Sequence, residues 1–344
     1  MTRVRLTKHS FKYTWHANLS ESVHQQDRYR TIVIGVGEAG SNTVIQLTEM
    51  NLTGVKCIAV DTADGKSGRT VTKESMKHVE DSLSNSDIVF ITSSLDNRKE
   101  SRITLIIAEM ARRKGLVVIG VLATPFRSQR SENGNFAFLA EMRRQCDTVL
   151  VIDIDKLVTL VPHLSKSEAF KVVDQVLANT LRGIVETISG PNLISLEFPD
   201  FKTIVRQGGV AAVGIGESDA PNRAEDAVRN ALSSPLLGVD CTGATGALVN
   251  VTGDSQMTIE EANRVGEIIT EMMGANTLVI WSAKVNPQQQ GKLKVTLVMT
   301  GINPPNSLKT LGKIAPQLFD LESSSLEPQK PLDIDLELYQ MEKF

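Results

Sequence analysis

The stretch TIVIGVGEAGSN, residues 31–42, decides the fold class of this chain. Its β-branched first half predicts a buried strand. Gly35, Gly37 and Gly40 then form a GxGxxG spacing that opens a helix, and the N-terminus of a helix can bind phosphate. Asp61 ends the next apolar run, at the distance where dinucleotide-binding folds carry a ribose-binding carboxylate. Taken alone, the stretch predicts a dinucleotide fold, with tight strand–helix packing as the other explanation of the glycines.

Apolar runs and helical patterns alternate after this turn. The apolar runs are continuous, as expected for strands covered on both faces, and lie at 31–36, 55–60, 87–92, 116–122 and 147–152. Helical patterns fill the intervals at 41–51, 74–85, 99–114 and 134–145. This alternation predicts a parallel sheet with helices on both sides.

A long helix separates this part of the chain from the next. Residues 166–189 carry apolar side chains at helical spacing, Ser165 and Glu168 form a capping box, and Gly190-Pro191 ends the helix. At about 1.5 Å per residue it would be about 36 Å long. Beyond it, a second and smaller α/β domain is predicted from strands at 193–198, 210–216, 246–252, 277–283 and 294–300, with helices at 222–232 and 258–273.

We therefore expect two α/β domains joined by the long helix, with residues 193–303 not continuing the first parallel sheet. The expected parts are a flexible basic arm (1–29), a nucleotide-binding-type domain (30–165), the central helix (166–190), a second domain (191–303) and an acidic flexible tail (304–344).

The composition excludes several classes of protein. The net charge of −3 does not support a dedicated nucleic-acid binder, and 4% aromatic residues do not support base-stacking platforms. No apolar run is long enough to span a membrane, and the N-terminus lacks the apolar segment of a secretory signal. Cys57, Cys146 and Cys241 are scattered and do not have the spacing of a metal site. The expectation is a cytoplasmic protein without a bound metal.

Several stretches, taken in order, resemble the FtsZ family, the bacterial and archaeal relatives of tubulin, over about residues 30–303. IGVGEAGSNTV resembles the first nucleotide loop of the family, and DTVLVIDIDKL resembles a part of the base pocket. EAFKVVDQVLANTLRGIVETIS resembles the central helix, and NLISLEFPDFKTIV the loop that inserts into a neighbouring subunit. VGIGESDAPNRAEDAVRNALSSPLL and GATGALVNVTG resemble the opening of the second domain.

The resemblance implies a tubulin/FtsZ-like fold: a Rossmann-like nucleotide domain with a parallel sheet, a long central helix and a second, smaller α/β domain. It also implies GTP or GDP as ligand, Mg only if GTP binds, and FtsZ-type subunits as partners in homo- or hetero-assembly. The candidate nucleotide site, either a weak binding site or a relic of the family's site, consists of Gly35, Gly37, Gly40, Asn42, Asp61, Phe170 and Asp174. Phe170 also fits a core position on the apolar face of its helix.

The sequence departs from the family at the loop that cradles the phosphates. In place of the glycine-rich GGGTGTG stands DNRKESR, residues 96–102, without any glycine. Asp96 and Glu100 add like charge where phosphate would approach. We predict that this segment begins the next helix, with Ser93/Ser94 or Asp96 as N-cap. The alternative is that the basic side chains Arg98, Lys99 and Arg102 bind phosphate in place of the missing backbone groups.

Other family features are lost or changed nearby. The stretch from Asp61 to Ser82 is too short for the family's third, glycine-rich loop. Glu38-Ala39 replaces two glycines of the first loop and brings a carboxylate beside the phosphate position. Ile154 stands where the family has a base-contacting Asn. We therefore expect GTP binding and hydrolysis to be weak or lost.

The inserting loop is better preserved. Ser195, Glu197 and Asp200 match the family's Asn-x-Asp-x-x-Asp, whose carboxylates polarise the attacking water in the adjacent subunit's site. Glu197 and Asp200 are the candidate catalytic residues, with the end of a strand and a helix cap as the other interpretation. The segment PLDIDLELY, 331–339, resembles in style the tail motif by which this family binds adaptors.

Three functions follow, and whether the chain is an enzyme stays open. The first is an FtsZ-like cytoskeletal protein of cell division or cell shape, a filament component or regulator with a degenerate nucleotide site. The second is an active, polymerising GTPase with a remodelled phosphate loop. The third is an NAD- or FAD-dependent enzyme with a Rossmann fold, for which no substrate-side acid or base is evident.

Overall fold

The structure, a computed structural model, describes residues 29–50, 52, 54–60, 73–95, 98–124, 134–154, 156, 166–189, 197–206, 209–234, 237, 243–273 and 277–302. The strands in this part of the chain are β1 (Thr31–Val36), β2 (Val55–Val60), β3 (Ile88–Ser94), β4 (Val117–Ala123), β5 (Thr148–Ile152), β6 (Val210–Ser218), β7 (Gly246–Gly253), β8 (Leu278–Val285) and β9 (Leu293–Ile302). The helices are α1 (Gly37–Glu49), α2 (Lys73–Ser84), α3 (Arg98–Arg113), α4 (Gly134–Gln145), α6 (Lys166–Ser189), α7 (Phe198–Arg206), α8 (Arg223–Leu232), α9 (Ile259–Met273) and the 3-10 turn η2 (Pro287–Gln289).

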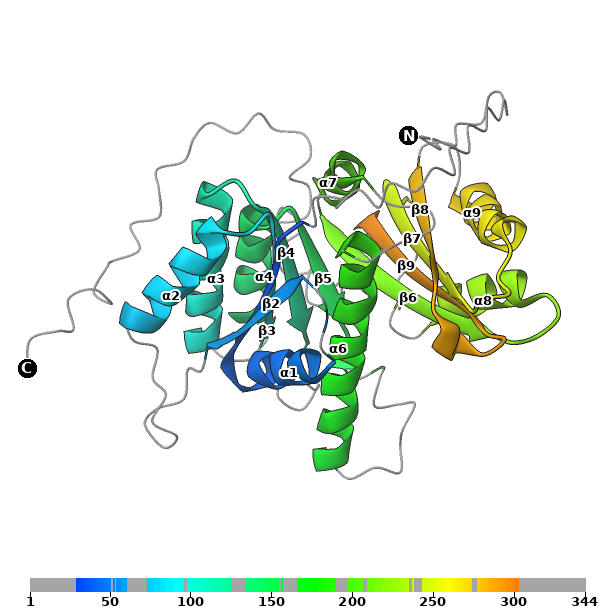
Figure 1. Cartoon of the computed structure of the whole chain (residues 1–344). Helices are drawn as coiled ribbons and strands as arrows, with labels where there is room; N and C mark the ends of the chain where they lie inside the picture. The colour runs from blue at the N-terminus through cyan, green and yellow to red at the C-terminus, as the bar shows by residue number, and fades with distance from the viewer. Residues whose placement is uncertain are drawn as a thin grey trace, which may run out of the picture.

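All of these strands form one hydrogen-bonded sheet in the order β2-β1-β3-β4-β5-β6-β9-β7-β8. Strands β1 to β5 are parallel, as the alternating pattern predicts. Every residue of β1, β3, β4 and β5 is buried, which explains why their sequences are continuous apolar runs. Helices on both faces of the sheet supply that cover (Figure 1).

The expectation that residues 193–303 do not continue the first parallel sheet is wrong at β6. Val210 and Ala211 pair in parallel with Val149 and Leu150 of β5, so the two halves of the sheet are hydrogen-bonded. Beyond these two pairs the direction changes: β9 is antiparallel to β6 and to β7, while β8 is parallel to β7. Val210 follows Gly209, whose φ of +82° favours glycine, and this local turn brings β6 alongside β5.

Two apolar cores lie on opposite faces of the sheet. On one face, side chains such as Ile34 and Val89 pack with Leu83 of α2, Ile107 of α3 and Met142 of α4. The same face continues under α8 and α9 in the second half. The other face packs against α1, α6 and α7, for example through Leu47, Leu181 and Phe201. The fold is thus a three-layer α/β/α arrangement.

Helix α6 has the bounds that the sequence predicts, and it crosses between the two halves of the molecule (Figure 1). Its N-terminal half packs beside α1. Its C-terminal half reaches the second half of the sheet, where a Cβ on Gly183 would lie 3.3 Å from the side chain of Thr296 in β9. Glu186 also lies 3.8 Å from Lys284 Nζ of β8. The helix therefore contacts both groups of strands.

The predicted strand at 193–198 is wrong at its last residue, because Phe198 begins helix α7; residues 193–196 lie outside the described part. Proline is tolerated in the first turn of a helix, so Pro199 does not prevent this start. Phe201, Ile204 and Val205 are buried on one side of α7. Helical spacing of these apolar residues thus overrides the strand-like appearance of the preceding run.

Tyr29, placed by the sequence analysis in the flexible arm, is docked on α7. Its ring stacks on Phe198 with centroids 4.5 Å apart, and its hydroxyl oxygen accepts a hydrogen bond of 3.2 Å from the Phe198 backbone N–H. The N–H groups of a first helical turn have no partner within the helix. The Tyr29 hydroxyl therefore caps α7, and Tyr29 belongs to the fold.

This contact makes a testable prediction. Tyr29→Ala removes the stacking and the cap, and we expect it to lower the free energy of unfolding by about 1–2 kcal/mol. Tyr29→Phe keeps the ring and should lose only about 0.5–1 kcal/mol. Urea unfolding of both variants measures the difference. Equal losses from the two substitutions would show that the ring contributes nothing.

Candidate functional site

The GxGxxG turn lies at the carboxyl edge of the parallel sheet, where β1 ends and α1 begins. Gly37 is the first residue of α1 and has a φ of +75°, a conformation that favours glycine. Val36 at the N-cap position gives α1 no side-chain hydrogen bond. The N-terminus of α1 therefore presents backbone N–H groups and the positive end of the helix dipole, the features that bind anions.

Two of the three glycines are required for packing. A Cβ on Gly35 would overlap the backbone carbonyl of Gly40, and a Cβ on Gly40 would overlap the carbonyl oxygen of Thr92 in β3. The helix can approach the sheet this closely only without those side chains. The packing explanation of the motif thus accounts for Gly35 and Gly40.

The third glycine, Gly37, has a different neighbour. The nearest atoms to a Cβ built on Gly37 are all from the carboxyl group of Glu100, which would overlap it. Glu100 lies in the first turn of α3, and only 8% of its surface is exposed. The Glu100 carboxylate therefore lies directly against the backbone where α1 begins.

The segment that replaces the family's glycine-rich loop is helical from Arg98 onward. The prediction that this segment begins the next helix is confirmed for 98–102, whereas residues 96 and 97 lie outside the described part. The proposed caps Ser93 and Ser94 are wrong, because both belong to β3. A helical backbone directs its N–H groups along the helix axis, so it cannot curl around phosphate as a glycine-rich loop does.

The basic side chains of this segment face solvent as far as they are described. Lys99 and Arg102 are exposed. The alternative in which they bind phosphate stays open as a prediction.

Two candidate base-contacting residues, far apart in sequence, meet in the structure. Asn42 of α1 donates a hydrogen bond of 3.3 Å from Nδ2 to Oδ2 of Asp174 in α6. Asp174 is 8% exposed. The pKa of its carboxyl group is raised to about 6: burial is the main cause, the hydrogen bond from Asn42 opposes the shift, and the negative charge of Glu38 adds to it. The pair joins the start of α1 to the long helix.

The remaining candidates are not placed at this site. Asp61 and the short third loop lie outside the described residues. Phe170 belongs to α6, but its side chain is not described. Whether it packs in the core or contacts a nucleotide base therefore stays a prediction. Among the residues that are described, no three His, Cys, Asp or Glu side chains gather to hold a metal ion.

The candidate catalytic carboxylates lie at the start of α7. Asp200 is in the first turn of α7, and Glu197 directly precedes it; the Glu197 carbonyl oxygen accepts hydrogen bonds of 3.1 and 3.0 Å from the N–H groups of Asp200 and Phe201. Glu197 is exposed and Asp200 is half-buried. The two carboxylates thus lie at the same end of one helix. Because α7 begins at Phe198, Asp200 lies inside its first turn and is not the cap of a helix that starts at Phe201.

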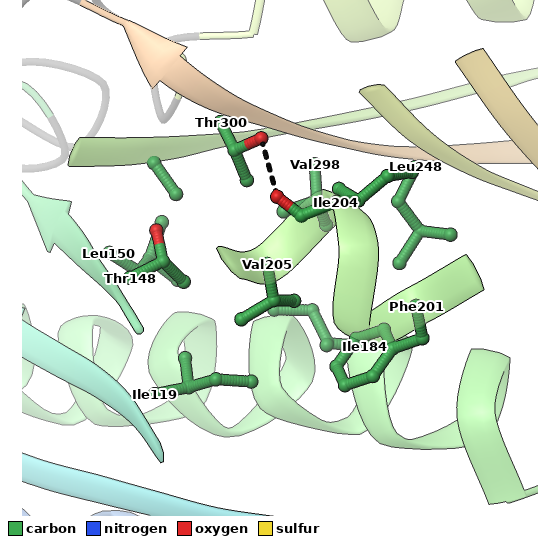
Figure 2. Close-up of a pocket in the computed structure, with 11 residues that line it drawn as sticks. Ile119, Thr148, Leu150, Ile184, Phe201, Ile204, Val205, Leu248, Val298 and Thr300 are labelled. Carbon is green, nitrogen blue, oxygen red and sulfur yellow. Dashed lines mark hydrogen bonds between the residues drawn. The ribbon is translucent and has the colours of Figure 1, made fainter. Parts of the chain in front are cut away.

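Helix α7 is fixed by an apolar junction between the two halves of the sheet, shown in Figure 2. Phe201, Ile204 and Val205 point toward side chains of β4, β5, α6 and β9 around a cavity of about 20 Å³. Thr300 Oγ1 of β9 donates a 3.2 Å hydrogen bond to the Ile204 carbonyl. This packing holds Glu197 and Asp200 on a rigid element.

The two groups of candidates contact different stretches of α6. Asp174 lies in its N-terminal half, whereas Ile184, in its C-terminal half, packs under α7. Because a helix rises about 1.5 Å per residue, Asp174 and Ile184 are about 15 Å apart along the axis. The α1 site and the helix that carries the α7 carboxylates therefore contact different turns of α6.

Sequence reasoning missed the contacts of Tyr29 and of Glu100. Glu100 carried a signal, since its charge lies in the segment that replaces the phosphate loop. Nothing in the sequence indicates that Tyr29 packs on Phe198. No described helix has the length and apolar character that crossing a membrane requires.

These features define the class of tubulin-like proteins, in which a Rossmann-like domain and a second α/β domain flank a long helix. Two solved structures have this fold. The empty FtsZ dimer of M. jannaschii matches with a TM-score of 0.74 at 33% identity, over 80% of this chain and 89% of that one. The GTPγS-bound CetZ2 protofilament of Haloferax volcanii matches at 0.68 and 18% identity, over 85% of this chain and 98% of that chain, which shows the fold alone.

Sequence relatives give the family. "Cell division protein FtsZ 2" of Methanocaldococcus jannaschii is 37% identical, over 80% of this chain and 81% of its own length. "Cell division protein FtsZ 2" of Haloferax volcanii is 32% identical, over 91% and 85%. Residues 209–303 also match the model of the FtsZ family C-terminal domain. The chain belongs to the FtsZ family.

Proposed function

We propose that this protein is a cytoplasmic, FtsZ-like cytoskeletal protein of cell division or cell shape, whose own GTP binding and hydrolysis are weak or lost. The observation that carries this proposal is the start of α3: the backbone is helical from Arg98, where the family has a glycine-rich phosphate loop. Losing two or three charge-assisted hydrogen bonds, worth about 1.5–3 kcal/mol each, weakens binding by about a thousandfold or more.

In this proposal the nucleotide site is a relic. Gly35 and Gly40 are retained for packing, and Gly37, Asn42 and Asp174 keep the outline of a site that binds GTP or GDP weakly, with Mg only if GTP is bound. Asp61 and Phe170 complete the candidate set. The chain is divided in this proposal into a nucleotide-binding-type domain, residues 30–165, and a second domain, residues 191–303, which α6 joins.

Assembly follows from the unequal ends of the molecule. In the family, the nucleotide face of one subunit meets the inserting loop of the next, so Glu197 and Asp200 would act on a neighbouring subunit's site. The α7 end keeps both carboxylates on a packed helix, while the α1 end has lost its phosphate loop. We propose that the α7 end docks on the exposed nucleotide end of an ordinary FtsZ filament and limits further growth.

Co-sedimentation with an FtsZ that binds GTP normally tests this assembly. We expect the wild-type protein to pellet with GTP-dependent polymers and to shorten them, and Glu197→Ala/Asp200→Ala to lose about tenfold or more of this binding, since it removes two charges from the docking face. Glu109→Gln, on α3, is the matched control. Long GTP-dependent filaments of this protein alone would contradict the capping role.

Calorimetry separates the alternatives. Titration with GTP, GDP and NAD at matched concentrations should give weak or undetectable heats for all three. Tight GTP binding would favour the active GTPase. The observation that supports this alternative is that the basic side chains of Lys99 and Arg102 are exposed at the start of α3. Tight NAD binding would favour the Rossmann enzyme, although family membership gives no support for it. The adaptor-binding role of 331–339 stays a proposal, and that segment lies outside the described residues.

A further inference from the structure

At Gly37, the candidate nucleotide site of this chain differs from a site that has room for a phosphate. In a GxGxxG turn, the second glycine allows the backbone to approach the phosphates of the ligand. In this structure the space left by the missing Cβ of Gly37 is taken by the carboxyl group of Glu100, whose Cδ and both Oε atoms are the nearest atoms to that position. The face of Gly37 that a phosphate would approach is therefore filled by the protein itself.

The position of Glu100 follows from the sheet. β1 and β3 are parallel neighbours, so α1 and α3, which follow them, both begin at the carboxyl edge of the sheet. Glu100 lies in the first turn of α3 and contacts the first residue of α1. Its carboxyl group thus lies near two helix N-termini, each of which favours a negative charge.

Glu100 is buried where it contacts Gly37. With 8% of its surface exposed, Glu100 has lost most of its hydration, a loss that an ionised carboxylate tolerates only where other groups compensate for it. Helix N-termini provide such compensation, as they do for a bound phosphate. Glu38, the other acidic residue of the turn, is exposed to solvent.

We propose that the Glu100 carboxylate is a resident anion that takes the place of a nucleotide phosphate at the start of α1, so that the chain closes its nucleotide site with its own side chain. This inference rests on the proposed function, in which nucleotide binding is weak, and it gives that weakness a specific cause. The missing glycine loop lowers affinity by removing contacts, whereas Glu100 excludes the ligand by occupying its position.

The test is a titration of purified full-length variants with GTP and with inorganic pyrophosphate. Glu100→Ala removes the carboxylate, frees the face of Gly37, and should bind both probes at least about tenfold more tightly than wild type, which corresponds to about 1.4 kcal/mol. Glu100→Gln keeps the side-chain volume but not the charge, and should give a smaller gain. Glu109→Gln changes a carboxylate at the other end of α3, where it pairs with Arg113, and should leave affinity unchanged.

The outcomes distinguish this inference from the proposed function. If wild type binds weakly and Glu100→Ala binds equally weakly, the resident anion is wrong and the proposed function stands. If wild type already binds GTP tightly, the proposed function itself fails. If Glu109→Gln also gains affinity, the effect is one of net charge and the local contact plays no part. Should Glu100→Ala not fold by circular dichroism, an unchanged affinity in folded Glu100→Gln overturns the proposal.

Discussion

At pH 7, Asp174→Asn is expected to be more stable than wild type by about 2–3 kcal/mol. The buried carboxyl group has a pKa raised from 3.8 to about 6, so the folded protein holds its proton more tightly than the unfolded chain does. Each unit of pKa shift corresponds to about 1.4 kcal/mol. Asparagine has the same shape, carries no charge, and its carbonyl oxygen can still accept the hydrogen bond from Asn42.

The sign of the pH dependence follows from proton binding. Between pH 3.8 and about 6 the folded state binds more protons at Asp174 than the unfolded state. The free energy of unfolding of wild type therefore falls as pH rises through this window, and the destabilisation is complete above it. Asp174→Asn has no such group, so its advantage should grow from about 0.5 kcal/mol at pH 4 to its full size at pH 7.

Urea unfolding of both proteins at pH 4, 5, 6 and 7 measures this difference. Asp81→Asn, which changes an exposed carboxyl on α2, serves as the control and should not reproduce the pattern. A stability difference between Asp174→Asn and wild type that is the same at pH 4 and pH 7 would mean that the carboxyl is not destabilised by burial.

The second large effect is expected from Gly40→Ala, which should lower the free energy of unfolding by about 3 kcal/mol or more. The added Cβ would overlap the carbonyl oxygen of Thr92, and both atoms belong to the backbone or are fixed to it. Neither can rotate away, so α1 must move from the sheet, and overpacking of a core costs about 1–3 kcal/mol even where side chains can adjust.

Ser41→Ala is the matched control for Gly40→Ala because it lies next to it on the same helix. Ser41 Oγ is buried without a hydrogen-bond partner, so its removal should be neutral or slightly stabilising. Thermal or urea unfolding compares the two variants. Equal stabilities of Gly40→Ala and wild type would show that the strand–helix distance at this turn is not constrained by glycine.

Gly40 of α1 and Asp174 of α6 are expected to affect stability in opposite directions. Gly40 supports the fold, whereas Asp174 lowers its stability at neutral pH. A residue that lowers stability through a raised pKa, and that lies beside another candidate site residue, is a candidate for a functional role. If Asp174→Asn leaves the affinity for GTP unchanged, the Asn42–Asp174 pair is a relic.

The secondary structure could be read from the sequence because it depends on local patterns. Strands β1, β3, β4 and β5 are buried and mostly apolar, whereas β2 contains Lys56 and is partly exposed; the observed bounds of α6 are those given by its helical spacing and its Gly-Pro end. The exception is the stretch 193–198, whose apolar residues predict a strand. From Phe198 the chain is helical instead, because a helix places Phe201, Ile204 and Val205 on one buried side. A short apolar run fits either structure until its packing partner is known.

The sequence by itself determined the family, the order of strands and helices up to α6, and the loss of the glycine loop, since each of these depends on consecutive residues. Only the tertiary structure decided which residues meet: Asn42 with Asp174, Glu100 with Gly37, Tyr29 with Phe198, and β6 with β5. In each pair the partners come from segments separated by other elements. Their contact depends on how helices and strands pack on the sheet, because composition and periodicity carry no information about distance between remote segments.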